Sequence, residues 1–229
     1  MQVRCEIDHV FICTSRGAPA AELLVRAGLT EGSPNRHPGQ GTACRRFFFS
    51  NAMLELIWLD NEIEAHSEQT RRTGLFERLS GAPPGAISDA GRMASPFGVI
   101  LRPALECEVI CPWPSWSYCP PTMPGLELEI ASTDPGEPMW CWMKSGMAPA
   151  QWPPERRQPL EHPAGFREVT GVRIACPELT PDSVTGTMAR TGLIGLETAV
   201  EHRLELQFDR GSRGTTIDFR PALPLIVSA

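Results

Sequence analysis

The first residues of the chain alternate between apolar and polar side chains, which predicts a β-strand. One face of this strand would carry every second residue: Val3, Cys5, Ile7, His9, Phe11 and Cys13. Residues 17–27 then carry the apolar stripe of a short helix, and Gly28 follows where helices commonly end on glycine. We therefore expect a strand and then a helix.

A loop and two more strands are expected next. Residues 31–41 (EGSPNRHPGQG) are rich in glycine, proline and asparagine, so they are expected to lack regular structure. Residues 43–49 (ACRRFFF) and 53–59 (MLELIWL) are apolar runs of strand length, and the Ser-Asn pair between them predicts a tight turn. Residues 1–60 thus give the order strand, helix, loop, strand, strand.

A similar order returns near the C-terminus. Residues 168–176 are expected to form a strand, and Thr180-Pro181-Asp182 is expected to start a helix that runs to about residue 193. Two further strands are expected at 202–208 and 215–219. This internal repeat predicts an α+β fold with βαβββ-like modules at residues 1–60 and 165–229.

Residues 61–164 differ in character, and we expect them to be an insert. A helix is expected within 62–79, with strands at 97–101 and 126–130. Residues 112–159 are dense in proline and tryptophan, and a disordered linker would not carry so many tryptophans. Extra strands and ordered loops are therefore expected to pack on the core of one domain that spans residues 1–229.

The composition restricts the class of partner. The chain is 41% hydrophobic and 21% charged, as in ordinary globular proteins, and its net charge of -6 argues against a nucleic-acid or anionic-membrane partner. No apolar run approaches the roughly 20 residues that span a bilayer. The first residues are typical of a strand and not of an export signal, so we expect a cytoplasmic location.

The eight cysteines are scattered along the chain. Without an export signal they are expected to be reduced and mostly buried. Cys107, Cys111 and Cys119 form the one cluster in the sequence, but their spacing does not match the C-x2-C pairs of structural zinc sites.

Two ionisable residues interrupt apolar strand faces. His9 stands between Ile7 and Phe11, and Glu55 stands between Met53 and Ile57. A carboxylate on such a face is costly unless it is paired, hydrogen-bonded or bound to a metal. From periodicity alone, two interpretations stay open: a buried His–Glu hydrogen bond, or a shared divalent cation.

The segments IDHVFICT, RHPGQGTACRRFFF and AMLELIWL resemble the first module of the vicinal oxygen chelate superfamily, and most of all its glyoxalase-like domains. The resemblance is best over residues 1–60 and weaker over 165–229. It implies paired βαβββ modules whose curled mixed sheets form a cup. It also places His9 and Glu55 at the positions of metal ligands.

The second module of that superfamily supplies further ligands. Laying EVTGVRIAC on EIDHVFIC puts Gly171 opposite His9, so the second histidine is missing, whereas laying TTIDF on AMLEL puts Asp218 opposite Glu55. The resemblance thus implies a site of His9, Glu55 and Asp218, with Asp218 as third ligand or general base. One imidazole and two carboxylates suit Mn, Fe or Ni better than structural Zn, and such sites also occur empty. A second interpretation gives His202 the place of the lost ligand, although a strand-end histidine bonded to backbone explains it as well.

Other residues are candidates for binding the substrate. His37 and Gln40 bring polar groups to a glycine-containing loop, and Arg173 shares a strand face with Gly171, where it could hold an anionic substrate. A tight turn and a surface arginine would give the same pattern. Five aromatic residues either line the mouth of a pocket or pack in the core: Trp113, Trp116, Tyr118, Trp140 and Trp142.

Two functions follow from the resemblance. The first is a metal-dependent lyase, isomerase or dioxygenase acting on a small oxygen-rich molecule. The second is a non-catalytic binding protein of the drug-resistance type, without a metal. Retention of His9 and Glu55 favours the enzyme, and the missing second-module histidine favours the binding protein. Either would have a small-molecule partner, and exposed sheet edges would allow a homodimer.

Overall fold

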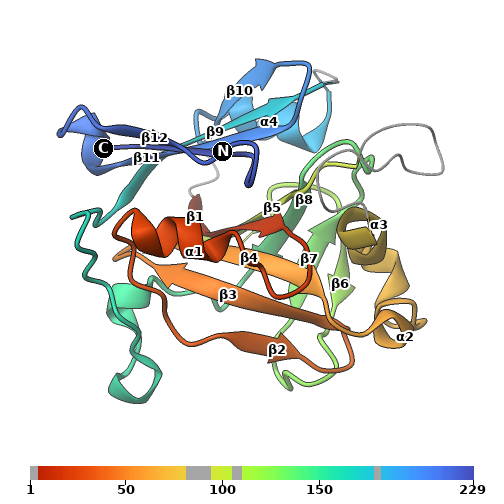
Figure 1. Cartoon of the computed structure of the whole chain (residues 1–229). Coiled ribbons are helices and arrows are strands. Elements are labelled where there is room, and N and C mark those ends of the chain that lie inside the picture. The colour runs from red at the N-terminus through yellow and green to blue at the C-terminus, as the bar shows by residue number, and fades with distance from the viewer. Residues whose placement is uncertain (1–4, 81–93, 105–109, 178–181) are drawn as a thin grey trace.

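The computed structural model describes residues 5–80, 94–104, 110–177 and 182–229 and has an α+β fold. It contains an eight-stranded and a five-stranded mixed sheet with a few short helices (Figure 1). None of the helices in the described part of the chain has the length and apolar character needed to span a bilayer.

The N-terminal elements form one half of the large sheet. They are β1 (Cys5–Cys13), α1 (Ala21–Arg26), β2 (Asn35–His37), β3 (Thr42–Phe48) and β4 (Met53–Leu59). The strands expected at 43–49 and 53–59 are confirmed. The expectation that 31–41 lacks regular structure is wrong in part, because Asn35–His37 pairs with Thr42–Cys44 as an antiparallel edge strand.

The other half of the large sheet comes from the middle of the chain. After α2 (Glu62–Ala65), the 3-10 turn η1 (Arg71–Thr73) and α3 (Leu75–Ser80), it contains β5 (Phe97–Pro103), β6 (Ser115–Tyr118), β7 (Leu128–Ala131) and β8 (Met139–Met143). The strand order is β2-β3-β4-β1-β5-β8-β7-β6. In each half the first strand is parallel to the last, and the halves meet where β1 runs antiparallel to β5.

This pairing differs from the arrangement expected from the sequence. Residues 61–164 are not an insert outside the paired sheet, because four of their strands complete it. Residues 165–229 do not pair with the first half and build a sheet of their own. The apolar runs of β5 (FGVILRP) and β8 (MWCWM) suit central strands that are covered on both faces.

The small sheet lies beside α1 (Figure 1). It contains β9 (Val169–Cys176), β10 (Gly195–Thr198), β11 (Arg203–Phe208), β12 (Thr216–Asp218) and β13 (Leu225–Ser228), in the order β10-β9-β11-β13-β12. The helix α4 (Val184–Arg190) begins after Ser183, whose hydroxyl accepts a hydrogen bond from the Gly186 N–H. The helix start expected at Thr180 lies outside the described residues. Three further 3-10 turns are η2 (Pro149–Gln151), η3 (Pro154–Arg156) and η4 (Asp209–Gly211).

The large sheet is apolar on both faces. One face packs on the small sheet, with Phe49 and Phe208 in ring contact at 4.6 Å, and this core also takes up Trp113, Trp140 and Trp142. These tryptophans are therefore core residues and not part of a pocket mouth. The opposite face carries a second apolar cluster that includes Phe11, Ile57, Ile100, Tyr118 and Cys141. The described cysteines are all free, and Cys107 lies outside the described residues.

Candidate functional site

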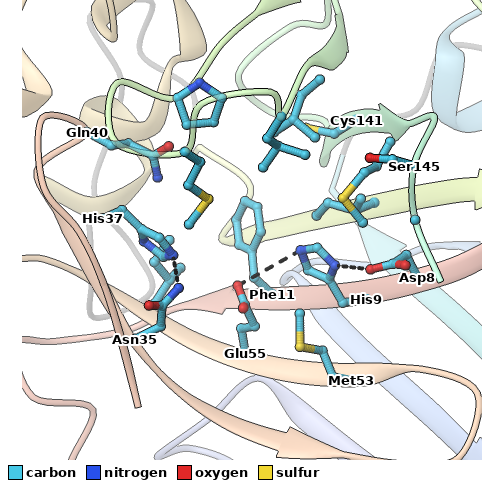
Figure 2. A pocket seen from close by; sticks show the side chains of 18 of the residues that line it. Asp8, His9, Phe11, Asn35, His37, Gln40, Met53, Glu55, Cys141 and Ser145 are labelled. Atoms are coloured by element: carbon cyan, nitrogen blue, oxygen red, sulfur yellow. Dashed lines mark hydrogen bonds and ion pairs between the residues drawn. The ribbon is translucent and has the colours of Figure 1, made fainter. Parts of the chain in front are cut away.

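A pocket of about 430 Å³ opens on the face of the large sheet that bears the second apolar cluster. Both halves of the sheet line it, and so does the segment that follows β8. Figure 2 shows part of its lining, with His9 and Glu55 pointing toward one another from neighbouring strands. Both residues line this pocket, so the structure brings together the two ionisable residues that interrupt the apolar strand faces.

A β-bulge in β1 shapes the polar end of the pocket. Ile7 pairs with Leu101 and His9 pairs with Ile100, so Asp8 is an extra residue in the ladder between β1 and β5. Asp8 and His9 consequently both line the pocket, although they are adjacent in the sequence. Ile7, which simple alternation placed beside His9, instead packs against the core between the sheets.

The buried Asp8 and the partly buried His9 form a hydrogen-bonded pair. Nδ1 of His9 lies 2.7 Å from Oδ1 of Asp8, which leaves Nε2 directed at the pocket. Asp8 also accepts a hydrogen bond from the buried Arg102, at 3.3 Å. Burial alone would lower the pKa of His9, but the hydrogen bond to Asp8 and the charges of Glu55 and Asp8 outweigh it and raise that pKa.

Glu55 faces this pair from the middle of β4. Its Oε2 atom lies 4.0 Å from Nε2 of His9, and its Oε1 atom lies 3.8 Å from Sγ of Cys44. Burial and the nearby Glu55 carboxylate raise the pKa of Cys44, so that this thiol stays protonated. The polar end of the pocket therefore holds two carboxylates with an imidazole between them (Figure 2).

A chain of hydrogen bonds forms the next wall. The Asn35 amide donates to Nε2 of His37 at 3.0 Å, so the proton of the neutral ring is on Nδ1, which lies 2.9 Å from Oγ1 of Thr42. Burial lowers the pKa of His37, which favours this neutral form. Gln40 donates to the same Thr42 oxygen at 2.8 Å. His37 and Gln40 thus line the pocket, as the sequence analysis expected, with their polar groups already engaged in this chain.

Hydrogen bonds also join the turn after β2 to β6 and the segment that follows it, at the two outer edges of the large sheet. Tyr118 on β6 donates to Oε1 of Gln40 at 3.1 Å, and Thr122 donates to the Pro38 carbonyl at 3.0 Å. Burial raises the pKa of Tyr118 to about 12, so its hydroxyl remains a donor. The described residues contain no ladder between β2 and β6, so these side-chain contacts bring the edges together without closing a barrel.

The rest of the wall is mostly apolar, with two arginines. Arg46 on β3 and Arg156 at the end of η3 line the pocket together with Trp152. The apolar residues include five methionines: Met53, Met123, Met139, Met143 and Met147. Sequence reasoning did not identify Asp8, either arginine or the methionines. The His9–Glu55 face could have indicated Arg46, because Arg46 is the cross-strand partner of Glu55.

Three candidates from the sequence lie elsewhere, on the small sheet. Asp218 is 44% exposed and forms an ion pair with Arg220, whose hydrogen bonds lower the pKa of Asp218 to about 2. Arg173 is 58% exposed and lies 3.7 Å from Glu205. His202 is buried, with its ring edge-on to Phe97. None of the three lines the pocket, so the structure does not bring Asp218 or Arg173 to His9 and Glu55.

Comparisons with known proteins extend to the fold but not to the chemistry. No family model matches the sequence, and no curated protein matches it. Among solved structures, a hypothetical protein from Staphylococcus aureus is similar over 98% of this chain and 99% of that chain, with a TM-score of 0.52 and 9% sequence identity. At this identity the likeness supports a shared fold alone.

Proposed function

We propose that this protein is a glyoxalase-like enzyme, a lyase or isomerase that moves protons on a small oxygen-rich molecule bound in the pocket. The observation that carries the proposal is the Asp8–His9 pair, which the bulge turns into the pocket 4.0 Å from Glu55. Asp8 fixes the imidazole through Nδ1 and leaves Nε2 to face a ligand. A base oriented by a buried carboxylate is a recurring arrangement in acid–base catalysis.

Glu55 and His9 can act together on such a ligand. The Glu55 carboxylate takes a proton from a carbon next to a carbonyl, and protonated His9 gives a proton from Nε2 to the carbonyl oxygen. In an α-hydroxy carbonyl compound, Glu55 then returns the proton to the former carbonyl carbon. His9 takes the proton of the hydroxyl on the adjacent carbon, whose oxygen becomes the new carbonyl, so the isomerisation is complete without net proton loss. The raised pKa of His9 keeps the acid form available to a higher pH.

The two halves of the large sheet also support a family fold. We infer that residues 5–59 and 97–143 are the paired modules of the vicinal oxygen chelate superfamily, curled into a cup around the pocket. The shared strand order of the two halves supports this, as does the hydrogen bond from Tyr118 on β6 to Gln40 in the turn that follows β2. Residues 165–229 would then be a sheet that backs the cup.

A divalent metal is not part of the proposal. The resemblance implies Mn, Fe, Ni or Zn held by His9, Glu55 and Asp218, but Asp218 lies on the small sheet and is paired with Arg220. Within the described ranges no group of three His, Cys, Asp or Glu residues could hold a metal ion. Catalytic metal sites usually have three protein ligands, so His9 and Glu55 alone are too few to hold a divalent metal ion.

The test is proton exchange followed by NMR in D2O, with a panel of α-hydroxy carbonyl compounds and hemithioacetals. We expect the α-proton of one panel class to exchange in the presence of the parent protein, and this exchange to fall at least about 100-fold in His9→Gln and in Glu55→Gln. Asp218→Asn is the matched control and should keep full activity. Elemental analysis accompanies the assay, and stoichiometric metal that is lost from a His9→Ala/Glu55→Ala variant would refute the metal-free mechanism.

A second function is favoured by the methionine wall. Five flexible thioether side chains adapt to ligands of different shape, which suits a protein that binds or sequesters small molecules. Ligand binding without proton exchange across the panel, unchanged in His9→Gln, would favour this non-catalytic function.

A further inference from the structure

Two arginines line the pocket with guanidinium groups that no described carboxylate approaches within 4.0 Å. Arg46 donates from Nε to the Ser33 carbonyl at 2.9 Å, and its guanidinium lies 5.1 Å from the centre of the Phe48 ring. The Arg156 guanidinium lies 4.8 Å from the centre of a Trp152 ring. Stacking fixes both groups in place but leaves their charges unneutralised.

The two arginines belong to distant segments that the fold brings together. The rings of Phe48 and Trp152 meet edge to face at 5.5 Å, so Arg46, Phe48, Trp152 and Arg156 form one row. Two hydrogen bonds donated by backbone N–H groups hold the segment after β8 against the first half of the large sheet. Ser33 N–H donates to the side-chain Oε1 of Gln158 at 2.9 Å, and Ala150 N–H donates to the Ser50 carbonyl at 3.1 Å.

The other charges of the pocket already have partners. Asp8 is bonded to Arg102 and His9, and Glu55 faces His9. Arg46 is the cross-strand partner of Glu55, but its guanidinium is held over Phe48, two residues further along the same strand face. The row of arginines and aromatic rings is therefore a positively charged wall beside an apolar cavity.

We propose that Arg46 and Arg156 form an anion-binding subsite, so that the pocket takes an organic anion whose apolar body lies against the methionines. A guanidinium group binds carboxylate, sulfonate or phosphate oxygens through paired N–H donors. Arg156 is exposed, so the anionic group of the ligand would lie at the pocket mouth. The proposal rests on the proposed pocket function and names its substrate class.

The test uses two fluorescent probes that differ in one anionic group. The anionic probe is 8-anilinonaphthalene-1-sulfonate, and the neutral probe is N-phenyl-1-naphthylamine, which lacks the sulfonate. Each is titrated into the full-length parent and into Arg46→Gln, Arg156→Gln and Arg157→Gln. Arg157 is the matched control, because it is the exposed neighbour of Arg156 and does not line the pocket.

We expect each pocket substitution to raise the Kd of the anionic probe about tenfold, which corresponds to about 1.4 kcal/mol, while the Kd of the neutral probe stays within about twofold. Arg157→Gln should change neither. An unchanged Kd of the anionic probe in both pocket variants would overturn the subsite and leave pocket binding intact. An equal loss of affinity for both probes would also overturn it, since the substitutions would then act by disturbing the structure of the pocket and not by removing a contact to the sulfonate. If neither probe binds the parent, the subsite and the proposed pocket function both fail.

Discussion

Arg102 provides the sharpest test of how the candidate site is held together. This β5 arginine is 3% exposed and donates four hydrogen bonds around the bulge. Its acceptors are the Ile7 carbonyl at 3.2 Å, Oδ2 of Asp8 at 3.3 Å, Oε2 of Glu6 at 2.9 Å and the Asn51 carbonyl at 2.9 Å. The substitution Arg102→Met keeps much of the apolar length of the side chain and removes every donor.

The expected loss follows from which partners remain buried. Removing one member of a buried ion pair costs about 3–5 kcal/mol, because the other charge stays buried without its partner. Glu6 is 49% exposed and can return to water, whereas Asp8 is 6% exposed and would keep only His9. We therefore expect the lower part of that range, about 3 kcal/mol of unfolding free energy. For a chain of this size this is a fall in Tm of about 6–12 °C.

The measurement is urea unfolding followed by tryptophan fluorescence, compared with Arg36→Met. Arg36 is 74% exposed and pairs with Asp60 at 3.0 Å, and such a surface pair contributes less than about 1 kcal/mol. Arg102→Met should also weaken binding of N-phenyl-1-naphthylamine, because the bulge places Asp8 and His9 in the pocket wall. A loss in Arg102→Met no larger than in Arg36→Met would refute the role of Arg102 as the clamp of the bulge.

Three further predictions concern the pocket and the small sheet. In Gly98→Ala the new Cβ would overlap the Phe11 ring. The free energy of unfolding, measured in urea, should therefore fall by about 1–3 kcal/mol. A loss below about 0.5 kcal/mol would contradict this packing. By NMR, His9 should titrate above and His37 below the ordinary histidine pKa. The stability that His9 contributes is then complete below the ordinary histidine pKa and is lost as pH rises through the raised pKa of His9. The stability that His37 contributes is lost as pH falls through its lowered pKa. If the two histidines titrated with the same midpoint, both assignments would be refuted. Asp218→Asn should leave unchanged the Kd of 8-anilinonaphthalene-1-sulfonate and the amount of any bound Mn²⁺. Weaker probe binding or a smaller amount of bound Mn²⁺ in this variant would show that Asp218 belongs to the site.

Local patterns predicted most elements of the first half of the large sheet. The run MLELIWL gives β4 with the same bounds, Met53–Leu59, because a strand that is covered on both faces is nearly continuously apolar. The turn before it and the strand β3 were predicted on similar grounds. The edge strand β2 was missed, since Asn35–His37 has no apolar pattern and is held by pairing with β3 alone.

The bulge and the strand pairing could not be predicted from periodicity. A one-residue insertion reverses which side chains share a face, so the alternation over residues 5–13 placed Ile7 with His9 where the structure has Asp8. The partner of a strand depends on contacts between distant residues. The likeness of EVTGVRIAC to EIDHVFIC reflects two strands of similar local pattern, β9 and β1, that lie in different sheets. That misplaced pairing also led to Asp218 and Arg173 as site residues.

The division of the pocket between the two halves of the large sheet explains why its chemistry is one-sided. By strand order β8 is the counterpart of β4, and where β4 presents Met53, Glu55 and Ile57 to the pocket, β8 presents methionine, cysteine and methionine at 139, 141 and 143. Burial raises the pKa of that cysteine thiol to about 12, so it stays neutral. The second half therefore offers no charged group where the first offers Glu55. A ligand that satisfies both halves must be polar on one side and apolar on the other. The proposed subsite of Arg46 and Arg156 restricts this class further, to anions.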